Sequence, residues 1–376
     1  MTCQRLVGYA KENGYPFLCV YGGHKTQRSV DGSVTSLELK RSPVSFKLDE
    51  DLAYDPLFQR HTRKVMREIA AFKPDVIHIT GLNDVSILGS YIGWKLDLPL
   101  VGSWHTNLHE FAASRMSKYL RFLGANTVSK ITGGAEKAIM SGAIYYYKMP
   151  KVLLVPNEEL RERLEKGTNR EARLMLRGVD TDLFSPAKRT ANDDIFRIGF
   201  VGRLRSEKNV RMLVEIEKLL LEHGRTGFRF LVVGEGSERE HLEKNLKHAE
   251  FTGFLEGDAL SEAYANMDVF VFPSTTDAFG NVAQEALASG VVPIVTNIGG
   301  PKFIVKDCVT GFVAKDAAEF TKHIEQLMDD PEMAGSMRST GLEAASNRSW
   351  NSVFASVYDA YQRSRVIWAE QRNIEI

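Results

Sequence analysis

One stretch of the C-terminal half combines two carboxylates with a glycine turn: Asp277-Ala278-Phe279-Gly280-Asn281-Val282-Ala283-Gln284-Glu285. It resembles a turn that enters a helix, where backbone N–H groups suit phosphate oxygens and Gly280 lets a ligand come close. Asp277 and Glu285 would then hold sugar hydroxyls on either side of a diphosphate. An ordinary helix cap by Asp277 and a surface position for Glu285 explain the spacing equally well, so both interpretations stay open.

Basic residues follow an apolar run earlier in the same half. Arg203 and Lys208 come after Ile198–Gly202, and positive groups there would neutralise a diphosphate leaving group. Two solvated surface charges are the more common outcome for these residue types. His105 follows an apolar run of the N-terminal half. A lone histidine is more often structural than catalytic, and a single hydrogen bond would satisfy it.

Three further patterns are weaker evidence for a functional site. Gly234-Glu235-Gly236 is a G-x-G without the third glycine, which makes it a weak dinucleotide fingerprint. Asp180-Thr181-Asp182 has the D-x-D form that holds a metal–nucleotide complex, but its place after Arg177-Gly178-Val179 favours a turn. The three cysteines are scattered and lack C-x-x-C spacing. A disulfide framework and a zinc site are therefore not expected, and a reducing cytoplasm fits.

The elements that must position these residues are clearest in the C-terminal half. Short apolar runs alternate there with helical patterns, at residues 198–201, 228–233, 269–272 and 291–295. Strands that are apolar on both faces and alternate with amphipathic helices predict a parallel sheet covered on both sides. This is a doubly wound α/β domain, in which ligands bind beyond the carboxyl ends of the strands.

The N-terminal half repeats this pattern less regularly. Its predicted strands are Phe17–Tyr21, Val76–Ile79, Leu98–Val101, Val152–Val155 and Arg173–Leu176, with a helix from Phe58 to Phe72. The polar segment 181–194 carries Pro186 and predicts the domain boundary. We therefore expect an N-terminal domain at 1–185, a C-terminal domain at 195–349 and a helical tail at 350–376 that packs back on the N-terminal domain. The fold class is α/β, with two Rossmann-like domains facing each other across a cleft.

The bulk composition fits this picture. The chain has 376 residues, of which 43% are hydrophobic and 26% charged, and the 48 basic residues balance the 48 acidic ones. Two domains are expected at this length, and no bulk charge favours nucleic acid. No signal peptide and no apolar run of membrane-spanning length is found. The expected location is cytoplasmic, with a peripheral contact to the membrane left open.

Taken together, these motifs resemble the retaining GT-B glycosyltransferases of group 1, a glycosyltransferase family four-like group. The resemblance covers roughly residues 75 to 360 and is strongest from 197 to 313. The matching stretches lie in the family's order and at its intervals. They are Phe200-Val201-Gly202-Arg203-Leu204 with Lys208-Asn209, Val233-Gly234-Glu235-Gly236, Pro273-Ser274, Asp277 to Glu285, Ala288-Ser289-Gly290, Gly299-Gly300-Pro301, the junction Arg177-Gly178-Val179-Asp180 with Phe184, and His105-Thr106.

The resemblance implies transfer of a sugar from a UDP- or GDP-linked donor to an acceptor hydroxyl, with retention of configuration and without a metal ion or other cofactor. The acceptor would be a sugar or a lipid-linked molecule. Arg203 and Lys208 would bind the diphosphate, Glu285 the ribose, and Asp277 and His105 the transferred sugar. The resemblance assigns the backbone around Ala278, Phe279, Gly280, Asn281 and Val282 to the phosphate and the sugar, and it places Glu235 along the cleft.

The sequence departs from the family pattern at two places. Asp277 stands where the family usually has Glu, which shortens the side chain by one methylene. The family also opens with a strand and a glycine-rich loop, whereas Thr2–Gly14 already has the pattern of the first helix. The N-terminal sheet is thus expected to be incomplete and open in its middle. The alternatives are a non-catalytic or truncated nucleotide-sugar-binding protein, a UDP-sugar epimerase and, more weakly, a nicotinamide oxidoreductase.

Overall fold

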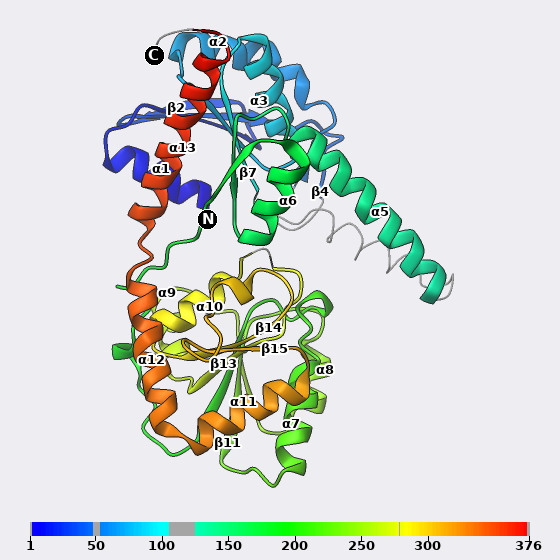
Figure 1. Ribbon diagram of the computed structural model, residues 1–376, viewed down its shortest axis with the longest axis vertical. Coiled ribbons are helices and arrows are strands. Elements are labelled where there is room, and N and C mark those ends of the chain that lie inside the picture. Colours follow the sequence, from blue (N-terminus) through cyan, green and yellow to red (C-terminus); the bar gives the residue numbers. More distant parts are fainter. Residues whose placement is uncertain (1, 48–52, 105–124, 278, 374–376) are drawn as a thin grey trace. The chain divides into compact units, whose positions relative to one another are not determined.

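The structure is a computed structural model, and it describes residues 2–47, 53–104, 125–277 and 279–373. Contacts within the chain divide it into two compact units (Figure 1). Unit 1 comprises Met1–Leu176 and Asn351–Ile376, and unit 2 comprises Arg177–Trp350.

The described residues of unit 2 form a sheet of six parallel strands in the order β12-β11-β10-β13-β14-β15. Their bounds are β10 (Phe196–Val201), β11 (Phe228–Val233), β12 (Ala249–Gly253), β13 (Val269–Phe272), β14 (Val292–Thr296) and β15 (Phe312–Ala314). Every residue of β13 and β14 is buried, as expected for strands covered on both faces. The predicted doubly wound α/β architecture is confirmed here.

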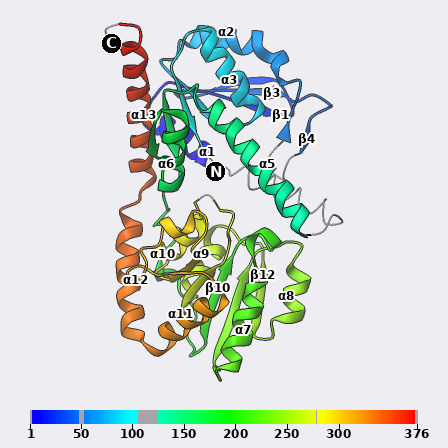
Figure 2. The same cartoon turned by 45° about the vertical axis from the view of Figure 1, so that its right-hand side comes forward.

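Helices connect these strands and flank the sheet (Figures 1 and 2). They are α7 (Met212–Glu222), α8 (Arg239–Asn245), α9 (Gly257–Ala265), α10 (Asn281–Ala288), α11 (Ala317–Asp329) and α12 (Pro331–Ser346). α7 packs against α11, while α10 packs against α9 and α12. Leu213, Ile216 and Leu220 are buried at the spacing that forms one face of α7. Asp316 caps α11, accepting from the Glu319 N–H at 3.0 Å.

The described strands of unit 1 fall into two main sheets. One has the order β1-β3-β2, with β1 parallel and β2 antiparallel to β3, and the other has the parallel order β6-β7-β8-β9. The strands are β1 (Phe17–Gly23), β2 (Gln27–Asp31), β3 (Val34–Lys40), β6 (Ile77–Thr80), β7 (Leu100–Ser103), β8 (Val152–Val155), β9 (Glu171–Leu174) and the short pair β4 (Phe46–Lys47) and β5 (Ala53–Tyr54). The helices are α1 (Thr2–Glu12), α2 (Thr62–Phe72), α3 (Asp84–Lys95), α5 (Ala125–Tyr146), α6 (Glu158–Thr168) and α13 (Trp350–Glu370).

One hydrophobic cluster joins the two sheets of unit 1. Leu88 and Ile92 of α3 pack in the same cluster as Val20 of β1, Leu39 of β3 and Ile77 of β6. Strands β1 and β6 therefore lie against the same helix. They do not pair with each other among the described residues, so the sheet of unit 1 is interrupted between them.

The last helix, α13, packs on unit 1. The Tyr361 hydroxyl lies 2.8 Å from Nδ1 of His78 on β6, and the Ser364 hydroxyl donates to the Leu100 carbonyl at 3.2 Å. Arg363 donates to the Glu171 carboxylate at 2.8 Å. These contacts assign the C-terminal helix to the N-terminal unit.

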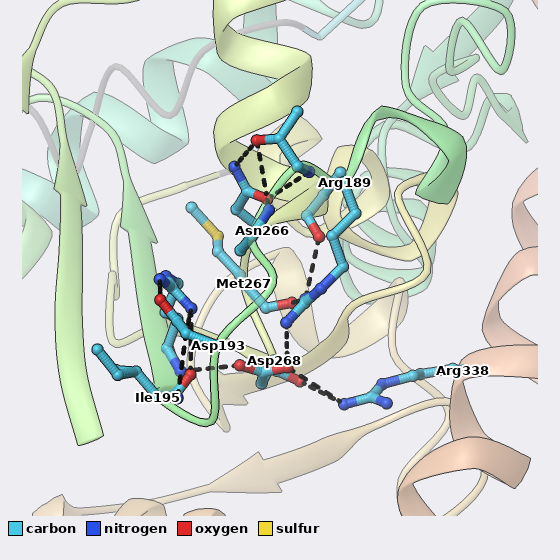
Figure 3. A network of polar contacts seen from close by, with 11 residues as sticks. Arg189, Asp193, Ile195, Asn266, Met267, Asp268 and Arg338 are labelled. Atoms are coloured by element: carbon cyan, nitrogen blue, oxygen red, sulfur yellow. Dashed lines mark hydrogen bonds and ion pairs between the residues drawn. The ribbon is translucent and has the colours of Figure 1, made fainter. Parts of the chain in front are cut away.

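The segment 181–194, predicted as the linker between the domains, packs on unit 2 instead (Figure 3). Arg189 donates to the Asp268 carboxylate at 3.0 Å and to the Met267 carbonyl at 3.2 Å. The amides of Thr190 and Ala191 both donate to the Asn266 side chain, at 2.9 and 2.7 Å. Because these bonds hold the segment to the start of β13, the division falls after Leu176 rather than at residue 185.

Candidate functional site

The strand order of unit 2 reverses between β10 and β13. From β10 the chain proceeds outward to β11 and β12, and from β13 it proceeds outward to β14 and β15 on the other side. In open α/β sheets the ligand crevice lies beyond the carboxyl ends of the strands at this switch point. The segments that follow the two strands are Gly202–Lys208 and Pro273–Gly280, which hold most of the predicted site residues.

Lys208 and Asp277 meet at the switch point. Nζ of Lys208 lies 2.7 Å from both carboxylate oxygens of Asp277. The side chains are only 12% and 22% exposed. The hydroxyl of Ser274, two residues after the end of β13, donates a further hydrogen bond to Asp277. The carboxylate is thus held by donors from two loops that are far apart in the sequence.

The lysine is also placed by its surroundings. Its Nζ lies 5.9 Å from the ring centroid of Phe272, the last residue of β13, a distance at which an aromatic face attracts a cation. The Thr276 hydroxyl donates to the Glu207 carbonyl at 3.2 Å, and this bond ties the loop of Lys208 to the loop of Asp277.

Helix α10 begins at the end of the second loop. Gly280 has a φ of +87°, which favours glycine, and a Cβ at this position would lie 2.7 Å from Cγ of Pro301. Asn281 and Val282 begin the helix, and the first N–H groups of a helix lack acceptors one turn back. The side chain of Phe279 is buried and anchors the turn. An anion at the switch point would therefore meet both a lysine and a helix N-terminus.

Glu285 lies one turn further along α10. Its Oε2 accepts a hydrogen bond of 2.9 Å from the hydroxyl of Tyr264 on α9. Burial, and to a lesser extent the charge of Glu285, raise the pKa of Tyr264 well above its usual value. The neighbouring Gln284 is buried and donates to the Arg177 carbonyl at 2.8 Å. Helix α10 is thus fastened at Gln284 and at Glu285, the residue predicted to bind ribose.

Two further predicted site residues, Arg203 and Glu235, follow β10 and β11. Arg203 is exposed in the loop after β10. Glu235 follows β11 and forms an ion pair with Arg239 of α8, and its carboxylate lies beside Gly253 at the end of β12. Since β12 is on the far side of β11 from the switch point, Glu235 is directed away from Lys208 and Asp277. Its backbone still serves the site, because the Glu235 carbonyl accepts from the Leu204 amide at 2.8 Å.

Two predicted positions, His105 and Ala278, lie outside the described residues. Within the described part of the chain, no group of three or more His, Cys, Asp or Glu side chains is arranged to hold a metal ion. The same residues include no helix long and apolar enough to cross a membrane.

Two side chains of the site were not predicted from the sequence. Ser274 belongs to a quoted motif, but only the structure shows its hydroxyl on Asp277. Tyr264 fits the apolar stripe of its helix, and that pattern hides its polar end. The available signal was its residue type, because a buried tyrosine hydroxyl usually finds a partner.

Two family models match the chain in succession. A model described as Glycosyltransferase Family 4 matches residues 3–183, and one described as Glycosyl transferases group 1 matches residues 195–330. The chain belongs to the group 1 glycosyltransferases. The two matches cover both units, and the second includes all the described contacts between Lys208, Asp277, Tyr264 and Glu285.

Relatives of this group 1 glycosyltransferase include two proteins named GDP-mannose-dependent alpha-mannosyltransferase. The one from Mycolicibacterium smegmatis is 31% identical over 255 residues, which are 65% of this chain and 62% of the relative. The one from Corynebacterium glutamicum is 25% identical over 370 residues, 95% of this chain and 83% of the relative. The chain therefore matches somewhat less than two thirds of the first relative's length.

Solved structures agree in fold. Sucrose-phosphate synthase from Thermosynechococcus elongatus has a TM-score of 0.69 at 18% identity, covering 96% of this chain and 92% of its own. HepE from Anabaena, solved with UDP and glucose, has a TM-score of 0.64 at 15% identity, covering 96% and 95%. These similarities support the GT-B fold for this group 1 glycosyltransferase.

Proposed function

We propose that the protein transfers a sugar from a nucleoside-diphosphate sugar to an acceptor hydroxyl, with retention of anomeric configuration and without a metal ion. The observation that carries this proposal is the Lys208–Asp277 pair at the switch point of unit 2, beside the loop that opens helix α10. A cation and a helix N-terminus suit a diphosphate, and a carboxylate next to them suits a sugar hydroxyl.

In this proposal Lys208 and Arg203 stabilise the negative charge that grows on the leaving diphosphate. The amides at Gly280, Asn281 and Val282 bind its phosphate oxygens, and Glu285 holds the ribose hydroxyls. Asp277 accepts from a hydroxyl of the transferred sugar. The glycosidic bond to the donor phosphate breaks, a bond to the acceptor oxygen forms, and the acceptor proton leaves with the diphosphate or passes to solvent.

The relatives give only a starting point for the base and the sugar of the donor. Both relatives described above carry GDP-mannose in their names, and HepE was solved with UDP and glucose. We therefore propose a GDP- or UDP-linked donor and a sugar or lipid-linked acceptor. GDP-mannose is the first donor to test.

The test begins with binding and continues to turnover. Calorimetry with GDP and UDP measures whether the site in unit 2 accepts a nucleoside diphosphate, because each retains the groups that Lys208 and Glu285 are proposed to hold. Release of GDP or UDP from the matching donor, with and without EDTA, then measures turnover and its need for a metal. Proton NMR of the product reports its anomeric configuration. Absence of binding for both nucleotides would overturn the proposal, and loss of turnover with EDTA would overturn metal independence.

A second candidate is a protein that binds the nucleotide sugar without turning it over. The interruption of the unit 1 sheet between β1 and β6 favours it, because catalysis needs both an acceptor side and a donor side. Binding of the donor without release of nucleotide, in the presence of a panel of sugar and glycolipid acceptors, would support this candidate.

A further inference from the structure

Tyr264 is a polar residue that the proposed mechanism does not use. It is the only tyrosine in the sequence from Arg177 to Trp350, and its relative exposure is 0%. Its hydroxyl nevertheless donates a hydrogen bond to a charged group, Oε2 of Glu285, at 2.9 Å. A hydrogen bond to a carboxylate is stronger than one between neutral groups. This bond fixes where one oxygen of the Glu285 carboxylate lies.

The tyrosine ring is held from two directions. Phe184 meets it edge to face, with ring centroids 5.6 Å apart and an interplanar angle of 84°. Phe270 of β13 packs against it at 5.8 Å. Ser261, one turn before Tyr264 on α9, donates its hydroxyl to the Leu183 carbonyl. The ring therefore cannot leave Glu285 without disturbing β13 and the segment around Phe184.

The same aromatic packing reaches the other anchor of the proposed donor site. Phe270 lies 5.8 Å from Phe272, whose ring is 5.9 Å from Nζ of Lys208. Tyr264 holds the Glu285 carboxylate and Phe272 faces Lys208. Both of these aromatic residues thus pack against the ring of Phe270. This shared packing keeps the spacing between the two anchors constant, which is what a ligand with a ribose and a diphosphate needs.

We propose that Tyr264 is a positioning residue that orients the Glu285 carboxylate toward the ribose hydroxyls of the donor. The inference rests on the proposed function, because it takes Glu285 to be the ribose contact. Without the hydroxyl of Tyr264, the glutamate gains rotamers that face away from the ribose, so part of the binding energy is lost in ordering it.

The test compares Tyr264→Phe with the wild type, using GDP and 2′,3′-dideoxy-GDP as probes, or the uridine pair if the wild type prefers UDP. We expect the variant to bind the ribonucleotide about tenfold more weakly. We expect it to bind the dideoxynucleotide as well as the wild type does, because that ligand offers no hydroxyl to Glu285. In donor kinetics the KM should rise more than kcat falls.

The control is Tyr358→Phe on α13 of unit 1, which removes a buried hydroxyl that has no hydrogen-bond partner among the described residues; it should leave both affinities unchanged. If Tyr264→Phe does not fold, Phe184→Leu loosens the same ring, and we expect a smaller loss confined to the ribonucleotide. Equal weakening of both nucleotides, or no weakening of either, would overturn the positioning role while leaving the proposed function standing. A wild type that binds neither GDP nor UDP would overturn both.

Discussion

Nζ of Lys208 lies 2.7 Å from each oxygen of the Asp277 carboxylate, so two charges proposed to meet the donor already meet each other. The pair is mostly withdrawn from solvent, where water screens charges less than it does at the surface. An incoming diphosphate must therefore share Lys208 with Asp277, and the carboxylate repels it. Once a sugar hydroxyl engages Asp277, the lysine is available to the phosphate.

The substitution Asp277→Asn separates the repulsion between the carboxylate and the diphosphate from the contact between Asp277 and the transferred sugar. The amide keeps the shape but removes the negative charge, so free GDP or UDP should bind several-fold more tightly, on the order of 3- to 10-fold. Sugar transfer should slow on the order of 100-fold, because a contact to the transferred sugar is weakened. Calorimetry and initial rates measure the two changes. Asp277→Glu keeps the charge and should leave nucleotide affinity near that of the wild type; weaker nucleotide binding by Asp277→Asn would contradict the argument.

Arg203→Ala should weaken donor binding or slow transfer, about 10- to 100-fold in kcat/KM, because it removes a charge proposed to face the diphosphate. Arg203 is exposed, so the melting temperature should change little. The matched control is Arg229→Ala, an exposed arginine within β11, which should leave kcat/KM unchanged. Equal kcat/KM values for the two variants would remove Arg203 from the site.

Gly280→Ala tests the turn before α10. The φ of +87° strains an alanine, and its Cβ would lie 2.7 Å from Pro301. We expect a loss of roughly 1–3 kcal/mol in unfolding free energy together with weaker nucleotide binding. Gly335→Ala in α12 is the matched control, because its Cβ would meet nothing within 4 Å and alanine favours helix. If Gly280→Ala changed neither the unfolding free energy nor nucleotide binding, the turn would be shown to tolerate a side chain.

The sequence predicted the fold of unit 2 because four of its six described strands are short apolar runs; β12 and β15 were not predicted, and β12 lacks such a run. Val269–Phe272 is apolar at every position, and the structure has it as β13 with these bounds. Unit 1 was harder. The hairpin of β2 and β3 was not predicted, since the fully exposed β2 has none of the apolar alternation that marks a half-buried strand. The boundary was placed too late because Phe184 and Arg189 pack on unit 2 from a polar segment.

The site was predictable in its residue types but not in its pairings. The order of the motifs indicated that Lys208 and Asp277 both follow strands, and the switch point between β10 and β13 explains why they meet. The direction of Glu235 toward Arg239 could not be read from a G-x-G pattern. The bond from Tyr264 to Glu285 joins two helices, and such register between helices is set by packing rather than by local sequence.

A partly buried histidine in unit 1 predicts how the protein responds to acid. Nδ1 of His78 lies 2.8 Å from the Tyr361 hydroxyl, and Nε2 lies 2.9 Å from the Ser103 hydroxyl. Burial lowers the pKa of His78 to about 4 from its ordinary 6.5, because the charged imidazolium loses its water. Between these two values the unfolded chain binds a proton that the folded chain does not. The free energy of unfolding therefore falls as the pH drops from 6.5 to 4, by at most about 3 kcal/mol from this group.

His78→Gln removes that titration. The variant should be less stable than the wild type at pH 7, because it loses the packing and the two hydrogen bonds of the ring, and the difference should shrink as the pH falls toward 4. Urea unfolding followed by tryptophan fluorescence measures this, since three of the four tryptophans lie in unit 1. The control is His24→Gln, an exposed histidine of the same unit, which should leave the pH dependence unchanged. A constant difference between wild type and His78→Gln from pH 7 to pH 4 would mean that the His78 imidazole does not control the acid response of unit 1.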